Sequence, residues 1–272
     1  MVKARKRFGQ HFLEDAWVRK LIAASGVGPD DSVLEIGPGR GAITRPLSEQ
    51  VKQLVAVEVD RDLSAELDAA GLPNVTVVTG DVLTVDLVPA ITQWLGGPIG
   101  ADRRIRIVGN LPYNISSPIL FMLLDLAART DGIRDAMLML QKEVADRLVA
   151  KVGTGDYGVL TVLTALRADV SRVLALPPGA FRPPPKVHSA VVRLSFRQPT
   201  VTIADEALFV RMVRTMFTQR RKTVSNALKP FGADRGLHPA QVLEAVGIAP
   251  TRRPETLELA EMAALANAFV RS

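Results

Sequence analysis

Ile-Val-Gly-Asn-Leu-Pro-Tyr-Asn, residues 107–114, is the stretch around which this chain is organised. Apolar residues at positions 105, 107 and 108 predict a buried strand, and Gly109 ends it. Asn110-Leu-Pro-Tyr113 follows at the carboxyl end of that strand, where open α/β sheets bind their ligands. The stretch therefore predicts an α/β fold with a functional site at this strand end.

The chemistry that suits this tetrapeptide is methylation of an exocyclic amine on a planar base. Such an amine is a poor nucleophile because its lone pair is delocalised into the ring. The side-chain oxygen of Asn110 and a backbone carbonyl near Pro112 could accept its two N–H groups and localise the lone pair on nitrogen. Pro112 stiffens the turn, and Tyr113 offers a ring for base stacking. An ordinary proline turn is the alternative that these four residues leave open.

A glycine-rich loop follows the first predicted strand, residues 32–36. Gly37 and Gly39 allow the backbone to approach a ligand closely, and the helix expected from about residue 42 offers unpaired N–H groups. Glu58 ends the second predicted strand, 21 residues after Gly37, where an acidic residue binds ribose hydroxyls. This spacing fits the adenosine of either NAD or S-adenosylmethionine.

Asp81 and Val82 follow the third predicted strand, residues 75–79. Asp81 is placed to accept from an adenine amino group, and Val82 supplies a backbone N–H nearby. Asp81 also suits a cap on the next turn, so both interpretations stay open.

The spacing of apolar runs predicts about seven strands, the last two forming a hairpin, at residues 32–36, 53–60, 75–79, 105–108, 136–140, 170–176 and 189–196. This pattern favours a doubly wound, Rossmann-like methyltransferase sheet. Beyond residue 198 only helical patterns follow. We therefore expect a methyltransferase domain over residues 1–197, with a basic amino-terminal arm, and a small all-helical domain over residues 198–272.

Phe181 lies in a proline-rich loop, residues 177–186. A large apolar side chain there has no predicted helix or strand face to cover it. We expect its ring to form a sandwich with Tyr113 around a base, and an anchor in the core is the alternative.

A one-sign cluster of six basic residues, without any acidic residue between them, lies in the predicted helical domain: Arg211, Arg214, Arg220, Arg221, Lys222 and Lys229. Such a cluster would repel itself, which indicates a phosphate-rich partner. The net charge of +6 points the same way, although more weakly.

Composition excludes several classes of protein. The absence of cysteine excludes disulfides, zinc–thiolate sites and thiol catalysis, and the three histidines show no metal-ligand spacing. We expect no metal. No apolar run reaches the length of a membrane span, and no apolar core of a signal peptide follows the basic start. The chain is thus expected in the cytoplasm.

The sequence resembles the bacterial small-subunit ribosomal RNA adenine dimethyltransferases over nearly its whole length. Six motifs carry the resemblance, in the order Phe8-Gly-Gln-His-Phe-Leu13, Glu35-Ile-Gly-Pro-Gly39, Glu58-Val-Asp60, Asn110-Leu-Pro-Tyr-Asn114, Phe181-Arg-Pro-Pro-Pro-Lys-Val187 and Thr218-Gln-Arg-Arg-Lys-Thr223. The resemblance implies that S-adenosylmethionine donates methyl groups to N6 of two adjacent adenines near the 3′ end of small-subunit rRNA, two to each. It implies as partner a small ribosomal subunit or its precursor, and we expect a monomer when the protein is free.

The resemblance also places cofactor contacts on six positions, His11, Leu13, Gly37, Glu58, Asp81 and Asn110. Position 11 is often Asn in relatives, so the His here departs from the family pattern for a side-chain contact, whereas a backbone contact at Leu13 is unaffected. Three alternatives remain: a large-subunit rRNA adenine methyltransferase, a relative acting mainly in ribosome assembly, and a nicotinamide oxidoreductase if the glycine loop is considered alone.

Overall fold

The computed structural model describes residues 11–271 and divides into two compact units. Met1–Ala145 and Asp169–Phe196 form the first unit, and Asp146–Ala168 and Arg197–Ser272 form the second. Residues 146–168, which we expected in the first domain, group with the carboxyl-terminal helices. The reason is that helix α7 (Val159–Arg167) packs on helices α8 and α12.

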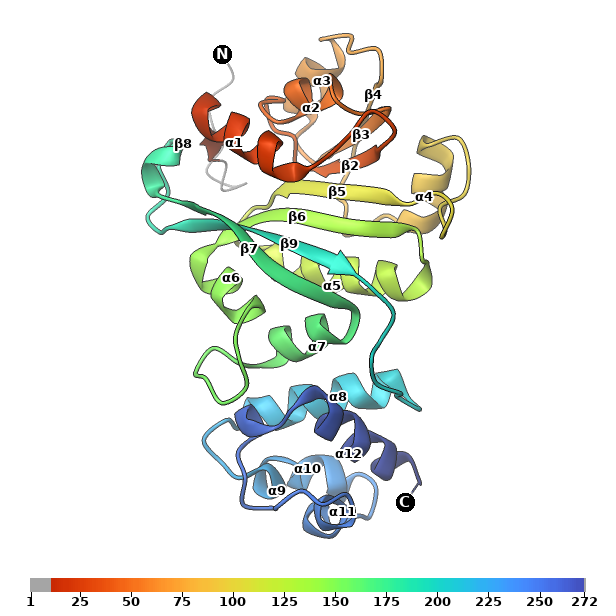
Figure 1. Ribbon diagram of the computed structural model, residues 1–272, viewed down its shortest axis with the longest axis vertical. Helices are drawn as coiled ribbons and strands as arrows, with labels where there is room; N and C mark the ends of the chain where they lie inside the picture. The colour runs from red at the N-terminus through yellow and green to blue at the C-terminus, as the bar shows by residue number, and fades with distance from the viewer. Residues whose placement is uncertain (1–10, 272) are drawn as a thin grey trace. The chain divides into compact units, whose positions relative to one another are not determined.

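A mixed seven-stranded sheet is the framework of the first unit (Figure 1). Its strands, in the spatial order β4-β3-β2-β5-β6-β9-β7, are β4 (Val75–Thr79), β3 (Gln53–Glu58), β2 (Ser32–Ile36), β5 (Ile105–Asn110), β6 (Ile133–Gln141), β9 (Ser189–Phe196) and β7 (Ala168–Leu176). The first five strands are parallel, and β9 joins β6 antiparallel. The predicted Rossmann-like fold is thereby confirmed. The strand order reverses between β2 and β5, and such a switch point opens a crevice at the carboxyl ends.

Helices cover both sides of this sheet, with α1 and α5 on opposite sides in Figure 1. The helices are α1 (Asp15–Ser25), α2 (Thr44–Ser48), α3 (Arg61–Asp68), α4 (Leu87–Trp94), α5 (Ser116–Arg129), α6 (Lys142–Leu148) and the short η2 (Pro178–Ala180). Helix α6 begins in the first unit and ends in the second.

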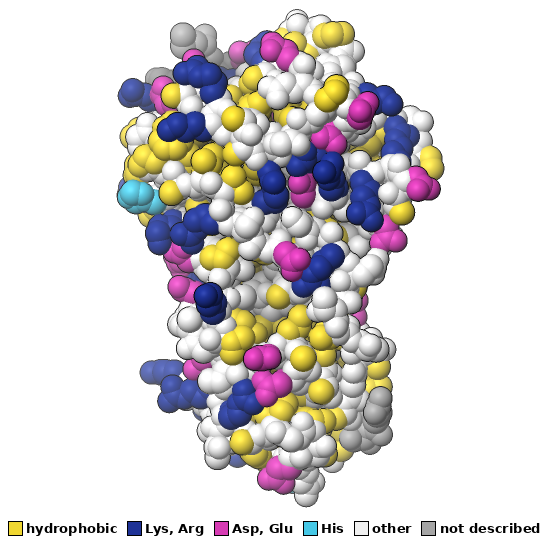
Figure 2. All heavy atoms as spheres, in the orientation of Figure 1, with side chains coloured by type: hydrophobic (Ala, Val, Ile, Leu, Met, Phe, Trp, Pro, Cys, Tyr) yellow, Lys and Arg dark blue, Asp and Glu magenta, His cyan; other side chains and the backbone are white. Residues whose placement is uncertain are grey.

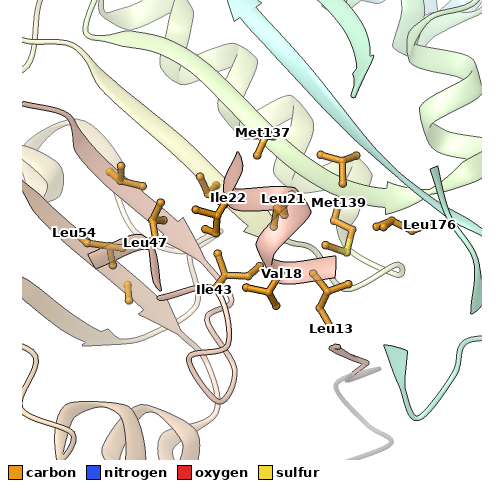
Figure 3. Close-up of a cluster of buried hydrophobic side chains, with 14 of the residues drawn as sticks. Leu13, Val18, Leu21, Ile22, Ile43, Leu47, Leu54, Met137, Met139 and Leu176 are labelled. Atoms are coloured by element: carbon orange, nitrogen blue, oxygen red, sulfur yellow. The ribbon is translucent and has the colours of Figure 1, made fainter. Parts of the chain in front are cut away.

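One buried cluster joins α1 and α2 to the sheet (Figure 3). Val18, Leu21 and Ile22 recur on one face of α1 at helical spacing, and all three are buried. Their side chains meet Leu47 of α2 and Met139 of β6 in the same cluster. The apolar face of α1 therefore holds this helix against the sheet. Because α1 begins at Asp15, its packing also limits where residues 11–13 can lie.

A second, two-stranded sheet was not predicted. Strand β1 (Phe12–Leu13) pairs antiparallel with β8 (Phe181–Arg182), and Leu13 lies opposite Phe181. Each strand has two residues, too few for a pattern of alternating polarity to register. The pairing joins the start of the described chain to the proline-rich loop.

Arg106, 4% exposed, anchors the carboxyl end of α1 from the beginning of β5. Its guanidinium donates to Asp135 of β6, with Nε 2.8 Å and Nη2 2.6 Å from the two carboxylate oxygens. Nη2 also donates to the carbonyl of Ser25 at 2.8 Å. Arg193 adds a second guanidinium that donates to the carbonyls of Ala24 and Ser25 at 2.6 and 2.8 Å. Two cations thus satisfy carbonyls that the end of a helix leaves unpaired.

The second unit is helical, as the pattern beyond residue 198 predicts. Its helices are α7 (Val159–Arg167), α8 (Glu206–Thr218), α9 (Val224–Ala227), α10 (Lys229–Ala233), α11 (Pro239–Ala245), η3 (Pro254–Thr256) and α12 (Leu259–Arg271). Asp205 caps α8, because its Oδ1 accepts from the N–H of Leu208 at 2.9 Å. Among the described helices, none has both the length and the apolar character needed to cross a membrane.

Candidate active site

A cavity of about 250 Å³ opens at the carboxyl ends of β2, β3 and β5. Its lining includes all eight predicted cofactor residues, namely His11, Leu13, Gly37, Gly39, Glu58, Asp81, Val82 and Asn110. Phe12 and Asn114, which lie inside two of the motifs, line it as well, as do Ile115 and Ile119, for which the sequence offered no distinctive signal. Tyr113 and Phe181 are not among the lining residues.

The glycine loop forms a thin wall of this cavity. Gly37 and Gly39 both adopt left-handed backbone conformations, with φ of 71° and 58°. A Cβ on Gly39 would lie 3.3 Å from Cε1 of Phe12, and one on Gly37 would lie 3.6 Å from the carbonyl oxygen of Asn110. Side chains at these two positions would be strained and would crowd the cavity.

Glu58 stands at the end of β3 with 5% of its surface exposed. Its Oε2 accepts from the N–H of Gly39, and its Oε1 accepts from the N–H of Asp60, both at 2.9 Å. Burial raises the pKa of the carboxyl, and these two hydrogen bonds oppose the shift. Glu58 thus fixes the glycine loop and also faces the cavity.

Glu58→Ala should weaken S-adenosylmethionine binding by about 1–3 kcal/mol, the range for losing a hydrogen bond to a charged group. Isothermal titration calorimetry measures this directly, with Glu58→Gln as the matched control because it keeps one acceptor oxygen. Unchanged affinity in a folded Glu58→Ala variant would exclude this role.

Glu35, one residue before the end of β2, is a charged side chain that our sequence analysis left without a role. It is 1% exposed, and its Oε2 has no hydrogen-bond partner among residues 11–271. Burial, reinforced by the nearby carboxylate of Glu58, raises the pKa of Glu35 to about 7. An acidic residue inside the apolar run 33–36 was the signal that could have marked it.

Asp81 and Val82 occupy the turn after β4. The Oδ1 of Asp81 accepts from the N–H of Leu83 at 3.0 Å, so this side chain caps its own turn. It is nevertheless exposed and lines the cavity, and Val82 is buried beside it. The contact with an adenine amino group stays a prediction.

Asn110 ends β5 at the cavity wall. Its Nδ2 donates to the backbone carbonyl of His11 at 3.0 Å, which leaves Oδ1 as the acceptor on the other branch of the amide. Leu111 is 1% exposed and anchors the turn, its N–H donating to the carbonyl of Met139 at 3.3 Å. The carbonyl of Pro112 accepts from the N–H of Ile115 at 3.1 Å.

Tyr113 is held at both ends. Its hydroxyl lies 2.6 Å from Oγ of Ser189 on β9, and its ring stacks on that of His11, with the centroids 5.8 Å apart and the planes at 24°. Burial raises the pKa of the phenol. Sequence reasoning missed Ser189, because nothing in the chain relates it to a tyrosine 76 residues away.

Phe181 is a core residue in this structure, 1% exposed, within the cluster that holds α1. The expected sandwich with Tyr113 is not formed here, and the ring beside Tyr113 is that of His11. Strand geometry gives the reason. Side chains alternate along β8, so Phe181 points inward and Arg182 is exposed.

Phe181→Ala should therefore lower the free energy of unfolding by about 3–5 kcal/mol, the usual cost of truncating a buried aromatic residue. Denaturant unfolding measures this loss, with Phe181→Leu as the control that retains bulk. A stable Phe181→Ala variant with weakened RNA binding would restore the base-stacking role.

The predicted RNA contacts lie in the second unit, and all six are exposed. Arg211 and Arg214 lie on α8, Arg220, Arg221 and Lys222 follow it, and Lys229 begins α10. Arg220 differs from the others because its Nη2 donates to the carbonyls of Gly155 and Tyr157 at 2.6 and 2.8 Å. It therefore holds a neighbouring loop. The basic residues 3–7 of the amino-terminal arm lie outside the described residues.

Lys and Arg side chains are spread over the face drawn in Figure 2, with Asp and Glu side chains among them. That face as a whole thus lacks the separation of signs seen along Arg211–Lys229, where no acidic residue intervenes. A contact of the one-sign segment with a phosphate backbone stays a prediction.

The chain is similar to proteins of one family over nearly its full length. The family model for ribosomal RNA adenine dimethylase matches residues 1–267. Ribosomal RNA small subunit methyltransferase A of Xylella fastidiosa is 46% identical, with 97% of this chain and 96% of the relative covered. The protein of the same name from Geobacter metallireducens is 45% identical, with coverages of 99% and 96%.

Two solved structures share the fold. A dimethyladenosine transferase from Plasmodium falciparum has a TM-score of 0.76 at 24% identity, covering 96% of this chain and 98% of that one. The 23S rRNA methyltransferase ErmE has a TM-score of 0.66 at 27% identity, with coverages of 95% and 99%. The resemblance predicted from sequence is confirmed, and the chain belongs to the ribosomal RNA adenine dimethylase family.

Proposed function

We propose that this protein transfers methyl groups from S-adenosylmethionine to N6 of two adjacent adenines near the 3′ end of small-subunit rRNA, two to each. The observation that carries the proposal is the placement of Asn110. Its Oδ1 is left as an acceptor beside the cavity, because Nδ2 is committed to the carbonyl of His11. Family membership and the names of the curated relatives support the same activity.

The cavity suits S-adenosylmethionine on grounds of its own structure. Gly37 and Gly39 keep its wall free of side chains in conformations that only glycine adopts readily. Glu58, Asp81 and Val82 line the cavity, which supports a ribose contact for Glu58 and adenine contacts for Asp81 and Val82. When bound there, the cofactor supplies a methyl group already activated by its sulfonium. Alignment by the pocket can contribute up to about 7–11 kcal/mol in well-oriented systems.

The chain's own residues prepare the amine. Oδ1 of Asn110 accepts one N–H of the adenine amino group, and a backbone carbonyl of the Leu111–Pro112 turn accepts the other. Both contacts favour a pyramidal nitrogen whose lone pair is available. No general base is needed before transfer. Because neither an amide nor a carbonyl takes up a proton at neutral pH, the proton displaced from nitrogen passes to water.

The target must be a base outside a stack, since the site lies at the bottom of a strand-end crevice. Extruding an adenine costs a few kcal/mol, least in a loop. We infer that the substrate is a small ribosomal subunit or its precursor and that the protein is a monomer when free. Incubation with labelled S-adenosylmethionine and separated ribosomal particles, followed by mapping of the modified base, tests the proposal. Label confined to small-subunit adenines is expected.

A second candidate is methylation of an adenine in large-subunit rRNA. The full-length likeness to the 23S rRNA methyltransferase ErmE favours it, at lower identity than the small-subunit relatives. The same experiment decides between the two, because label would then enter large-subunit rRNA.

A further inference from the structure

His11 places a planar heterocycle beside Tyr113. The two rings stack with their centroids 5.8 Å apart and their planes at 24°. An imidazole has the composition and size of the five-membered ring of a purine. The tyrosine predicted to stack on the target adenine therefore already contacts an adenine-like ring from its own chain.

Separate contacts hold the side chain and the backbone of His11. Nδ1 lies 2.7 Å from the carbonyl oxygen of Pro183, in the loop after β8. The backbone carbonyl accepts from Nδ2 of Asn110 at 3.0 Å, and Phe12 and Leu13 continue into β1. Of the contacts with residues 11–271, a rotation of the side chain would thus break the stack and the bond to Pro183. The backbone bond to Asn110 and the β1–β8 pairing would stay in place.

Tyr113 lacks this freedom. Its hydroxyl is 2.6 Å from Oγ of Ser189, which is 2% exposed and part of β9. Moving the tyrosine would leave a buried hydroxyl without that partner, which is unfavourable. When a base needs the face of Tyr113, His11 is the partner that can give way.

We propose that His11 is an internal placeholder for the target base, and that an incoming adenine displaces its imidazole from Tyr113. The inference rests on the proposed function, which brings an adenine to Asn110. It adds a specificity-determining role for position 11. Displacing the imidazole loses its stack on Tyr113. An adenine replaces that stack with its own and adds a bond to Asn110, whereas the smaller ring of a pyrimidine such as uracil replaces less of the stack.

The three histidines make the displacement directly observable by NMR. Imidazole Cε1–H signals are assigned with the variants His11→Gln, His188→Gln and His238→Gln. In the free protein the ring current of Tyr113 should shift the His11 signal, and Tyr113→Leu should remove that shift. Titration with adenosine 5′-monophosphate should move the His11 signal toward its position in Tyr113→Leu, and uridine 5′-monophosphate should move it less.

Two results would overturn the placeholder: an unshifted His11 signal in the free protein, or a shifted one that adenosine 5′-monophosphate leaves in place at every concentration. Methylation of ribosomal particles is assayed in parallel. A parent protein that labels no particle refutes the proposed function whatever His11 does. Labelled particles together with an immobile His11 signal refute only the placeholder.

Steady-state kinetics give a second readout, at saturating S-adenosylmethionine so that cofactor contacts do not intervene. His11→Ala should lower KM for small-subunit particles about 3- to 10-fold, the size of one stack or hydrogen bond that no longer has to be broken. The matched control is His188→Ala, an exposed histidine of the same unit, which should leave KM unchanged. An unchanged or higher KM in His11→Ala would contradict the proposal.

Discussion

Asn110→Ala should lower the rate of methyl transfer about 10²–10³-fold while the protein remains folded, by analogy with the loss of one preorganised polar group in other active sites. The substitution removes Oδ1, which we assign to the adenine amino group, and Nδ2, which holds the carbonyl of His11. Single-turnover transfer to small-subunit particles measures the first loss, and circular dichroism reports on folding.

Asn110→Asp separates the two roles of this amide. It keeps acceptor oxygens for the amino group but cannot donate to the carbonyl of His11, so it should retain more activity than Asn110→Ala. Near-parental turnover by Asn110→Ala would refute a mechanism with two acceptors.

Charge reversal in the basic segment should have the largest effect on substrate selection. Arg211→Glu, Arg221→Glu and Lys222→Glu in one variant should abolish methylation of small-subunit particles, because phosphate contacts would become repulsive. Binding of the parent should fall with salt at a log–log slope between about −0.7 and −0.9 per phosphate contact, and the variant should show a flatter slope. Affinity for S-adenosylmethionine should not change, because its predicted contacts all lie in the first unit.

Arg220 is deliberately left intact in that variant. Its bonds to the carbonyls of Gly155 and Tyr157 mean that reversal would disturb a loop as well as a charge. Arg253→Glu is the matched control, since this exposed arginine belongs to the same unit but lies outside the basic segment. Undiminished methylation by the triple variant would show that the basic segment does not bind the RNA and is an ordinary solvated surface.

The seven-stranded sheet could be predicted from sequence because the pattern of each of its strands is local. Runs such as 32–36 and 105–108 are mostly apolar, short and followed by glycine, so their type follows from a few neighbouring residues. The glycine loop and Glu58 were likewise placed by local spacing and lie together in the cavity.

Contacts between distant segments escaped prediction. The β1–β8 pairing joins Phe12–Leu13 to Phe181–Arg182. This pairing sets the direction of the Phe181 side chain, which points into the core. The stack of His11 on Tyr113 depends on the same pairing, because β1 follows His11 directly. The sequence analysis placed Tyr113 and Phe181 near the site. It could not show that Phe181 points into the core or that the ring beside Tyr113 is that of His11.

The arginine anchor at the end of α1 implies that some defects in cofactor handling will map far from the cofactor. Helix α1 has 11 residues, a length of about 16 Å, and begins two residues after β1. Arg106 and Arg193 bond the carbonyls at its opposite end, and Asp135 holds the guanidinium of Arg106. In a genetic screen, temperature-sensitive alleles at codons 106 and 135 would therefore weaken cofactor binding, although neither residue lines the cavity. Heat would loosen the carboxyl end of α1 first, and the loss of helix packing would then reach Phe12 and Leu13 through the chain that joins them.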